Sequence, residues 1–356
     1  MKLLIAGGGT GGHVFPALAV AREWQGRGGD REVVIVGTQR GLEAKLVPAA
    51  GLPLETIRAA GLKGMGAVKL AKNTALLLPA MWDSYGILRR HRFAAAFGVG
   101  GYASGPVMLA AMLRGVPTVV FEPNAEPGFT NRVLGRFAKR IATGFDETAR
   151  QWGVKVVATG CPVRAEFFAA PVNEHRAPFR VLITGGSQGA LPINRAVVDA
   201  MDLLAVRKND LRVVHQTGER DYNAVRVAYA RREFIAEVLP FIQNMAERFA
   251  QADLIVCRAG AITTAEVAAA GRAAIFIPFG AATDSHQFRN ARELERAGAA
   301  RVIPEPELGG ERLAREIFSL LDQPQRITEM EQRARTLARP HAVRDIVDLL
   351  ERVARP

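Results

Sequence analysis

Residues 253–290 read DLIVCRAGAITTAEVAAAGRAAIFIPFGAATDSHQFRN, and this stretch contains the pattern that decides the fold. The apolar run 254–257 leads into a glycine-containing turn at 258–260, which is typical of a buried parallel strand. Residues 263–270 are mostly good helix formers. A strand, a glycine turn and a helix start leave unpaired backbone N–H groups at the positive end of the helix dipole. The stretch therefore predicts a site for a phosphate.

A second apolar strand is expected at 274–279, followed by a helix that carries several hydrogen-bonding side chains. Asp284, Gln287 and Asn290 would lie close together on one face of that helix. We interpret the whole stretch as a site for a nucleotide sugar. Two other interpretations stay open: Thr263 and Glu266 fit a capping box, and Gln287 could lie on an ordinary solvated helix face.

Length and composition narrow the classes of protein. A chain of 356 residues with 49% hydrophobic residues predicts about two globular domains. The net charge of +12 favours anionic partners, but aromatic residues make up only 7% and do not alternate with basic ones, so we expect no nucleic acid partner. Cys161 and Cys257 are the only cysteines, and they predict neither a disulfide framework nor a metal cluster. We expect no metal and no cofactor.

The N-terminal sequence shows the same strand, glycine loop and helix arrangement. An apolar run at 3–6 leads into a loop with five glycines at positions 7–12, and then into a helical pattern at 14–24. The apolar run is too short for a signal peptide, and no run approaches the roughly 18 apolar residues of a membrane span. The glycine spacing differs from the dinucleotide-binding pattern, which disfavours a dehydrogenase.

Strands and helices alternate along the whole chain. Further strands are expected at 33–36, 94–99, 118–121, 141–143, 180–184, 213–216 and 235–239. This alternation predicts doubly wound parallel sheets, which bind ligands at the carboxyl ends of their strands. Prolines punctuate residues 160–178, after which the pattern restarts with a second glycine loop at 185–190. An amphipathic helix is expected at 343–353.

Taken together, these motifs resemble those of the MurG family. The matching segments are GGGTGGHVFPALAVA (7–21), GVGGYASGP (98–106), PNAEPGFTNR (123–132), GCPVR (160–164), TGGSQGA (184–190) and CRAGAITTAE (257–266), followed by Pro278-Phe279, His286-Gln287 and Asn290. Two positions differ: Pro123 stands where the family more often has Gln, and Cys161 where it usually has Asn.

The resemblance implies the GT-B fold, with two Rossmann-like domains facing a central cleft. It also implies inverting transfer of N-acetylglucosamine from UDP-N-acetylglucosamine to the C4 hydroxyl of the muramyl sugar of lipid I. The product would be lipid II, made at the cytoplasmic face of the cell membrane. The expected domains are 1–160 with 341–356, which would bind the acceptor and the membrane, and 161–340, which would bind the donor.

By the same resemblance, Ile242 would contact the uracil through its backbone and Glu266 would bind the ribose diol. The other donor contacts would come from Arg164, Ser187, Ala261, Ile262, Thr263, Thr264, Ala265 and Gln287. On the acceptor side, the loop Thr10-Gly11-Gly12 would hold the acceptor diphosphate. Further substrate contacts are expected from Tyr102, Ser104, Asn124 and Asn131.

Inverting transfer needs a base for the attacking hydroxyl. His13 is the first candidate because its ordinary pKa lies near neutrality and it sits where the glycine loop meets the helix. The alternative role for His13 is a hydrogen-bonding residue that shapes the loop. Glu122 is the second candidate for the base.

Residues 69–92 predict an element that binds anionic lipid. Leu76, Leu77, Leu78, Met81 and Trp82 are flanked by Lys69 and Lys72 before them and by Arg89, Arg90 and Arg92 after them. An apolar stretch between basic residues is typical of peripheral membrane contact. The alternative is a core helix that packs on the sheet.

Two rival functions share parts of these motifs. A UDP-N-acetylglucosamine epimerase would bind the same donor but would need no lipid-facing segment. Another GT-B transferase, acting on a different glycolipid or a natural product, is the closer alternative.

Overall fold

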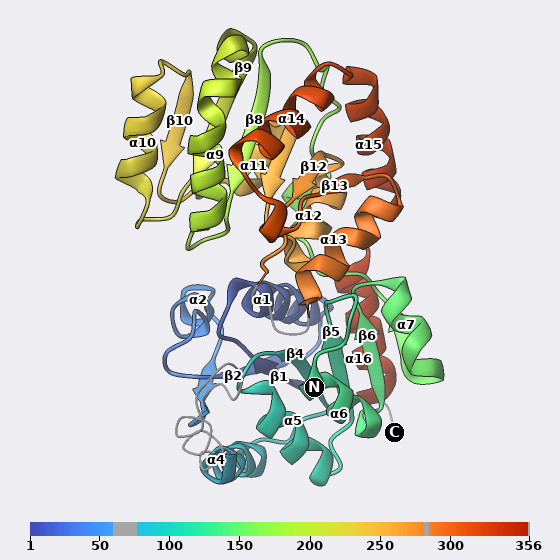
Figure 1. Ribbon diagram of the computed structural model, residues 1–356. Helices are drawn as coiled ribbons and strands as arrows, with labels where there is room; N and C mark the ends of the chain where they lie inside the picture. Colours follow the sequence, from blue (N-terminus) through green and yellow to red (C-terminus); the bar gives the residue numbers. More distant parts are fainter. Residues whose placement is uncertain (60–76, 281–284, 355–356) are drawn as a thin grey trace. The chain divides into compact units, whose positions relative to one another are not determined.

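The chain forms two parallel β-sheets, each with helices packed on both faces (Figure 1). The computed structural model describes residues 1–59, 77–280 and 285–354. All strand pairs in both sheets are parallel, as the alternation of strands and helices predicted. The predicted polar residue Asp284 lies outside the described residues.

The chain divides into an N-terminal unit of residues 1–163 and 341–356 and a C-terminal unit of residues 164–340. The sheet of the N-terminal unit has the order β3-β2-β1-β4-β5-β6-β7. Its strands are β1 (Lys2–Gly7), β2 (Glu32–Gly37), β3 (Leu54–Thr56), β4 (Ala95–Gly100), β5 (Thr118–Glu122), β6 (Arg140–Thr143) and β7 (Val156–Ala158). Its helices are α1 (Gly11–Gly26), α2 (Glu43–Ala49), α4 (Leu77–Arg90), α5 (Ser104–Leu113), α6 (Phe129–Phe137), α7 (Asp146–Trp152), η1 (Gly153–Lys155) and α16 (Ala342–Ala354).

The sheet of the C-terminal unit has the order β10-β9-β8-β11-β12-β13. Its strands are β8 (Phe179–Thr184), β9 (Leu211–Gln216), β10 (Ala236–Leu239), β11 (Leu254–Cys257), β12 (Ala273–Phe276) and β13 (Ala300–Val302). Its helices are α8 (Ala165–Phe168), α9 (Leu191–Leu204), η2 (Ala205–Asp210), α10 (Tyr222–Arg231), α11 (Met245–Gln251), α12 (Ala261–Ala270), α13 (His286–Arg296), η4 (Glu305–Glu307), α14 (Gly310–Leu321) and α15 (Pro324–Thr336).

The central strands are buried on both faces, which explains their continuous apolar runs. In β1, the four residues from Leu3 to Ala6 are completely buried. Leu4 and Ala6 belong to one core cluster with Val107 and Met108 of α5. Successive residues of a strand point to opposite faces, so Leu3 and Ile5 face the other side, where α1 and α16 pack (Figure 1).

The last helix, α16, packs on the N-terminal unit although it follows the C-terminal unit in sequence. Its apolar face, which includes Ile346 and Leu350, is buried. Its polar face forms ion pairs with the end of α1 and the loop after it, including Arg31 to Glu351 at 2.7 Å. Burial of the apolar face supplies most of the attachment, because ion pairs near the protein surface usually add only about 0–1 kcal/mol each.

Helices α4, α5 and α6 expose large apolar side chains, which we call the α4–α6 patch. Its members are Leu78, Trp82 and Tyr85 of α4, Leu109 and Leu113 of α5, and Phe129, Val133 and Phe137 of α6. Leu78 and Trp82 are 79% and 76% exposed, whereas Met81 packs against the core, so α4 has both an exposed apolar face and a core-facing one. Lys69, Lys72 and Leu76 of the predicted lipid-binding segment lie outside the described residues.

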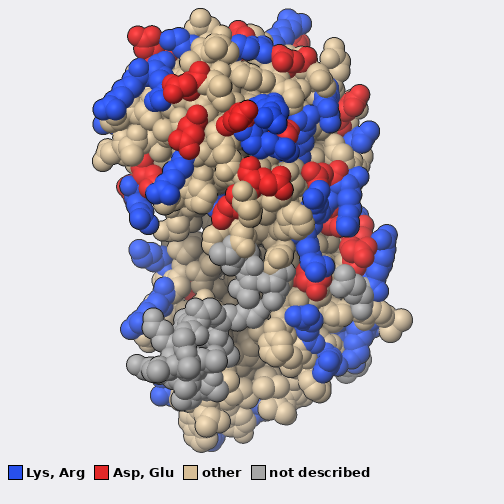
Figure 2. All heavy atoms as spheres, viewed as in Figure 1, with Lys and Arg blue, Asp and Glu red and all other residues tan. Residues whose placement is uncertain are grey.

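Helices α4 and α5 are in contact, and the Arg114 guanidinium after α5 lies 4.9 Å from the centre of the Tyr85 ring of α4. On the face shown in Figure 2, the N-terminal unit is largely uncharged, with Lys and Arg toward its margins. On the C-terminal unit, basic and acidic side chains are intermingled. Exposed arginines lie in or beside the same three helices, so the patch is an apolar surface with basic residues around it: Arg89, Arg90, Arg114, Arg132 and Arg136.

Candidate functional site

The predicted acceptor residues lie in the loops and helix starts that follow β1, β4 and β5, which are neighbours in the sheet. The loop after β1 leads directly into α1, whose N-cap is Thr10. The N–H groups of Gly11 and Gly12 belong to the first turn of α1, ahead of the first intrahelical bonds, which the N–H groups of His13 and Val14 make to the Thr10 carbonyl. This geometry suits an anion, and binding of the acceptor diphosphate here stays a prediction.

His13 projects back over the glycine loop from the first turn of α1. Its Nδ1 lies 3.1 Å from the Gly8 carbonyl oxygen and 3.3 Å from the Thr10 hydroxyl. A Cβ atom on Gly100 would lie 3.0 Å from His13 Nε2, so the ring packs directly against the loop after β4. Gly100 has a φ of +94°, which favours glycine, and a Cβ at this position would press against the ring.

The contacts of His13 suit a base. Burial lowers the pKa of His13 below its ordinary value, although the Gly8 carbonyl and Glu43 favour the charged form. The imidazole is therefore neutral near pH 7. When Nδ1–H donates to the Gly8 carbonyl, the lone pair is on Nε2, which can accept a proton.

Glu122, the second candidate for the base, is already fully hydrogen-bonded. Its carboxylate accepts hydrogen bonds from the N–H groups of Asn124 and Gly128 and from the side-chain amides of Asn124 and Asn131, all at 2.9–3.0 Å. The Asn131 amide also donates to the Phe121 carbonyl. Glu122 and Asn131 thus fix the loop that follows β5.

Of the two predicted acceptor residues in the loop after β4, only one reaches the surface. Tyr102 is 58% exposed. Ser104 is completely buried, and a Cβ on Gly98 would lie 2.9 Å from its hydroxyl oxygen. Ser104 therefore packs beneath the loop, and its contact with the acceptor stays a prediction.

The two positions that differ from the MurG pattern contact each other. Cys161 Sγ lies 3.5 Å from the Pro123 carbonyl oxygen. A Cβ on Gly144 would lie 2.4 Å from that oxygen and 2.5 Å from the sulfur, so the contact is tightly enclosed. Burial also raises the pKa of the Cys161 thiol, which stays protonated and can donate to the carbonyl.

In the C-terminal unit, the stretch that decided the fold forms β11, a turn and α12. The helix begins at Ala261, with Gly260 as its N-cap, two residues earlier than predicted. The first intrahelical bond runs from the Thr264 N–H to the Gly260 carbonyl, which leaves the N–H groups of Ala261, Ile262 and Thr263 at the open end of the helix. This geometry suits a phosphate.

The capping-box interpretation of Thr263 and Glu266 is wrong. Thr263 lies inside the helix and not at its N-cap, so Glu266 cannot reach back to a cap residue at position 263. Thr264 is buried, and its hydroxyl donates to the Ala261 carbonyl at 2.9 Å. The carboxylate of Glu266 is thus free of the local role that the sequence left open.

Glu266 lies beside Arg164, with Oε1 and Nη2 3.9 Å apart. Burial raises the pKa of Glu266 to about 7, and Arg164 opposes this rise. Arg164 itself stacks over the Phe167 ring at 5.0 Å, and its side chain is 42% exposed. The structure therefore brings together two of the predicted donor residues near the start of α12.

Gln216, which the sequence did not single out, ties the loops of the predicted donor site together. Its side-chain amide donates to the Thr184 hydroxyl at 3.1 Å and to the Gly186 carbonyl at 2.8 Å. Its Oε1 accepts the N–H of Ile242 at 2.7 Å. One buried side chain thus connects the ends of β8 and β9 with the segment after β10, where it holds the N–H of Ile242.

Ser187 is exposed in the loop after β8. The loop packs closely on the one after β9, because a Cβ on Gly189 would lie 1.9 Å from the Thr217 carbonyl oxygen. Gln287 has a different setting: its Oε1 accepts the N–H groups of Ala259 and Phe279, at 3.3 and 3.0 Å. Its carbonyl oxygen therefore fixes the turn before α12.

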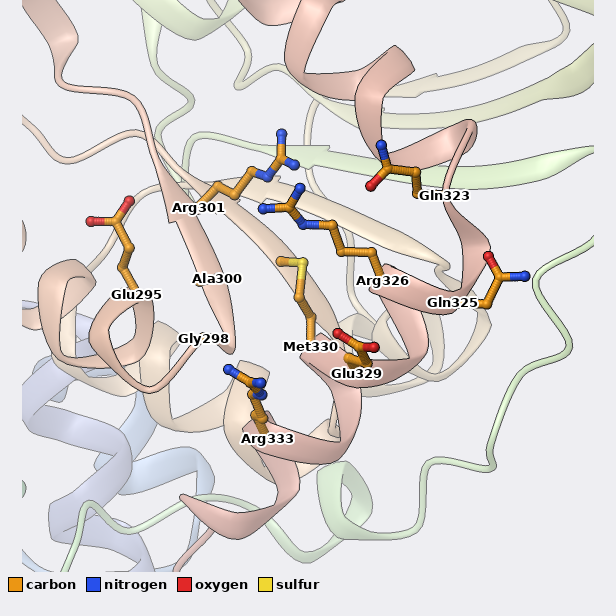
Figure 3. Close-up of a pocket in the computed structure, with 10 residues that line it drawn as sticks. All are labelled: Glu295, Gly298, Ala300, Arg301, Gln323, Gln325, Arg326, Glu329, Met330 and Arg333. Carbon is orange, nitrogen blue, oxygen red and sulfur yellow. The ribbon is translucent and has the colours of Figure 1, made fainter.

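A separate cavity of about 640 Å³ lies between β13 and α15 (Figure 3). Arg301, Arg326 and Arg333 surround it, with Met330 at its floor. Arg301 is already paired with Glu316. None of the residues predicted for the donor or acceptor site lines this cavity.

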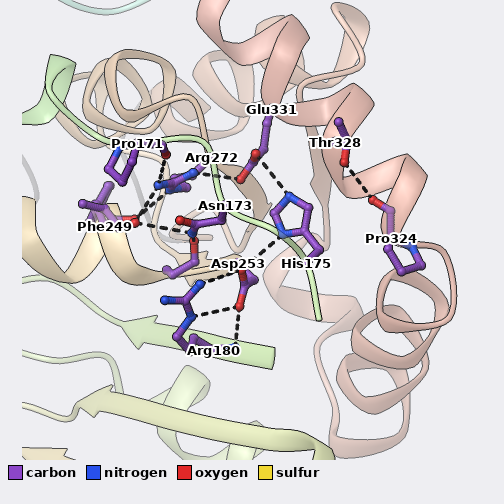
Figure 4. Close-up of polar contacts among 12 residues, drawn as sticks. Pro171, Asn173, His175, Arg180, Phe249, Asp253, Arg272, Pro324, Thr328 and Glu331 are labelled. Atoms are coloured by element: carbon purple, nitrogen blue, oxygen red, sulfur yellow. Dashed lines mark hydrogen bonds and ion pairs between the residues drawn. The ribbon is translucent and has the colours of Figure 1, made fainter. Parts of the chain in front are cut away.

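A buried polar cluster stabilises the C-terminal unit at the N-terminal end of β11 (Figure 4). His175 lies between Asp253 and Glu331, at 3.2 Å from each. The completely buried Arg272 donates to Glu331 at 3.1 Å, and Arg180 pairs with Asp253. The pairing makes burial of these charges possible.

Comparison with known proteins supports a common origin over the whole chain. Residues 3–143 match the N-terminal domain of glycosyltransferase family 28, and residues 180–350 match its C-terminal domain. Two relatives, from Anaeromyxobacter sp. (strain Fw109-5) and Myxococcus xanthus (strain DK1622), are 48% and 47% identical and are aligned over 100% and 98% of this chain and 94% and 92% of their own. Both carry the name UDP-N-acetylglucosamine–N-acetylmuramyl-(pentapeptide) pyrophosphoryl-undecaprenol N-acetylglucosamine transferase.

The fold agrees with a solved structure. The crystal structure of Acinetobacter baumannii MurG is 35% identical, covers 99% of both chains and superposes with a TM-score of 0.82.

Proposed function

The chain belongs to glycosyltransferase family 28, and we propose that it transfers N-acetylglucosamine from UDP-N-acetylglucosamine to the C4 hydroxyl of the N-acetylmuramyl-pentapeptide of lipid I. The product is lipid II, and the anomeric centre is inverted. The names of the full-length relatives support the substrates. The observation that carries the proposal is the pair of open helix starts, at α1 after the glycine loop and at α12 after Gly260, because donor and acceptor each bear a diphosphate.

The donor half of the site is in the C-terminal unit. The diphosphate of the donor binds at the open N–H groups of α12, and Arg164 adds positive charge. The carbonyl of Ile242 accepts the N3–H of uracil. The N–H of Ile242 is bound to Gln216, which holds this backbone segment in place. Glu266 accepts hydrogen bonds from the ribose hydroxyls.

The acceptor half is in the N-terminal unit, where Thr10, Gly11 and Gly12 bind the diphosphate of lipid I. The C4 hydroxyl oxygen attacks the anomeric carbon from the face opposite UDP, and the bond from that carbon to the UDP oxygen breaks. His13 Nε2 takes the proton of the hydroxyl. The negative charge that develops on UDP is stabilised by the start of α12 and by Arg164.

The enzyme works at a membrane surface, because the lipid tail of the acceptor stays in the bilayer. None of the helices among the described residues combines the length and apolar character needed to span a bilayer. The α4–α6 patch, with basic residues around it, fits peripheral binding to anionic lipid instead. We therefore assign the protein to the cytoplasmic face of the membrane, where UDP-N-acetylglucosamine is available.

A transfer assay tests the proposal. The protein is incubated with radiolabelled UDP-N-acetylglucosamine and a lipid I analogue, and label is followed into the lipid fraction. Label that depends on both the protein and the acceptor is the expected result. Conversion of the donor to an epimer without acceptor would favour the epimerase, and transfer only to other glycolipids would favour a different GT-B activity.

A further inference from the structure

Glu43, at the start of α2, is a carboxylate buried in the N-terminal unit with no role in the chemistry described above. Its side chain accepts the N–H of Gly9 at 2.6 Å, and the N–H and hydroxyl of Thr38 at 2.9 and 2.8 Å. The residue is only 1% exposed. Although burial favours the neutral form, these hydrogen bonds lower the pKa of Glu43 below its ordinary value, so it is charged at neutral pH.

The backbone around Glu43 is shaped to its side chain. A Cβ on Gly8 would lie 2.2 Å from the carboxyl carbon, and a Cβ on Gly41 would lie 2.0 Å from Oε2. A Cβ on Gly37 would lie 2.5 Å from Cγ. Glycines from the loops after β1 and β2 therefore enclose one carboxylate, and any larger residue at these positions would displace it.

This enclosure fixes the glycine loop at Gly8 and Gly9 and leaves the N–H groups of Gly11 and Gly12 available to a ligand. The N–H of Gly9 is bound to Glu43, and its carbonyl accepts the N–H of Leu42 at 3.5 Å. The carbonyl of Gly8 faces His13 Nδ1 at 3.1 Å. The loop is thus held as far as Gly9, while the N–H groups of Gly11 and Gly12 stay at the open start of α1.

We propose that Glu43 is a positioning residue of the acceptor half: its buried carboxylate sets the glycine loop, and through the Gly8 carbonyl it sets the orientation of His13. This inference rests on the proposed function for the role of the loop. Buried carboxylates are costly unless fully hydrogen-bonded, so an apolar side chain would serve a purely structural purpose with less difficulty. The hydrogen bonds to Gly9 and Thr38 instead fix two loops against each other.

The test uses Glu43→Gln, which keeps the size of the side chain. The side-chain amide of Gln has one accepting oxygen where the carboxylate has two. The N–H of either Gly9 or Thr38 therefore loses its partner. Hydrogen–deuterium exchange of residues 7–14 should become faster than in the parent. Turnover per active site, with sites counted by UDP binding, should fall by roughly 10²-fold, because small displacements of reacting groups cost about that much. The KM for UDP-N-acetylglucosamine should stay within about twofold.

Glu331→Gln is the matched control, since Glu331 is 2% exposed and lies in the polar cluster of the C-terminal unit. It should lower the melting temperature without changing turnover per active site. Unchanged exchange of residues 7–14 in Glu43→Gln would overturn the inference whatever the transfer assay gives. Faster exchange with parental turnover would also overturn it, because Glu43 would then be structural only. If the parent itself transfers no sugar, the proposed function fails, and the exchange measurement still decides whether Glu43 sets the loop.

Discussion

Arg164 and Glu266 lie 3.9 Å apart in the C-terminal unit, yet burial keeps the pKa of Glu266 near 7 despite the neighbouring guanidinium. Near neutral pH, Glu266 is therefore divided between its neutral and charged forms. A charged carboxylate binds ribose hydroxyls more strongly than a neutral one. We expect UDP affinity to rise as the pH increases through about 7 and to level off above it.

Glu266→Ala should weaken UDP binding by roughly 10- to 150-fold, since hydrogen bonds to a charged group contribute about 1.5–3 kcal/mol. The melting temperature should stay close to that of the parent, because α12 begins at Ala261 and has no capping box with Glu266. Calorimetric titration with UDP between pH 5.5 and 8.5 measures the UDP affinity and its pH dependence, and a thermal melt measures the stability. Glu266→Gln is the control that should lose the pH dependence. Parental UDP affinity in Glu266→Ala would exclude the ribose contact.

His13→Ala should reduce turnover by roughly 10²- to 10⁴-fold, which is the usual contribution of a general base. UDP affinity should not change, because the donor residues belong to the other unit. Since burial lowers the pKa of His13, turnover of the parent at saturating donor should be kept as the pH falls past 6.5 and lost only at lower pH. His341→Ala, which removes an exposed histidine of the same unit, is the control. Turnover within a few-fold of the parent at saturating acceptor would reject His13 as the base.

The long strands and the glycine loops were predictable from the sequence, because buried parallel strands form unbroken apolar runs that end in turns. The strands β3, β7 and β13 were not predicted. Each has only three residues and lies at the edge of its sheet, so its pairing depends on a neighbouring strand and not on a pattern of its own. The start of α12 was predicted two residues late, which was enough to suggest a capping box that does not exist.

The side chains that hold the predicted site were harder to find. Glu43 resembles an ordinary acidic residue in the first turn of a helix, and Gln216 stands at the end of an apolar strand. Each contacts backbone groups of loops that are distant in sequence, and such contacts leave no periodic signal. The glycines at 37 and 41, on either side of the β2–α2 turn, were the one available indication for Glu43.

His175 gives the C-terminal unit a stability that depends on pH. Burial opposes its charge, but the hydrogen bonds that His175 donates to Asp253 and Glu331 outweigh burial and raise the pKa of His175 to about 9. Unfolded histidine has a pKa near 6.5. The contribution of charged His175 to the free energy of unfolding is therefore complete below pH 6.5 and is lost as the pH rises to about 9. Its total is about 3 kcal/mol.

Hydrogen exchange of β8 and β11 amides between pH 6 and 9.5 measures this loss of stability, once the rates are corrected for the intrinsic exchange rate at each pH. Tryptophan fluorescence is unsuitable, since Trp24, Trp82 and Trp152 all belong to the N-terminal unit. His175→Gln should lower the stability at pH 6 and remove the loss between pH 6.5 and 9. An equal loss in parent and variant over that range would show that His175 is not its source.

The α4–α6 patch should bind anionic vesicles in a salt-sensitive manner. Trp82 and Leu78 provide the apolar contact, and each basic residue near the surface contributes about 1 kcal/mol. Changing Lys69, Lys72, Arg89 and Arg90 to Gln should abolish sedimentation with vesicles and leave activity on a water-soluble, short-chain acceptor intact. Leu78→Glu with Trp82→Glu should have the same effect through the apolar part of the patch.

Val206→Glu is the matched control, because Val206 is 79% exposed, as Leu78 is, but lies in the C-terminal unit. It should sediment like the parent. Arg90 also pairs with Glu55, so the melting temperature of the fourfold variant is measured alongside. If both patch variants fold and still sediment like the parent at low salt, the protein reaches its acceptor without this surface. If only the basic variant loses binding, electrostatic attraction alone brings the protein to the membrane, and the exposed Trp82 contributes no insertion.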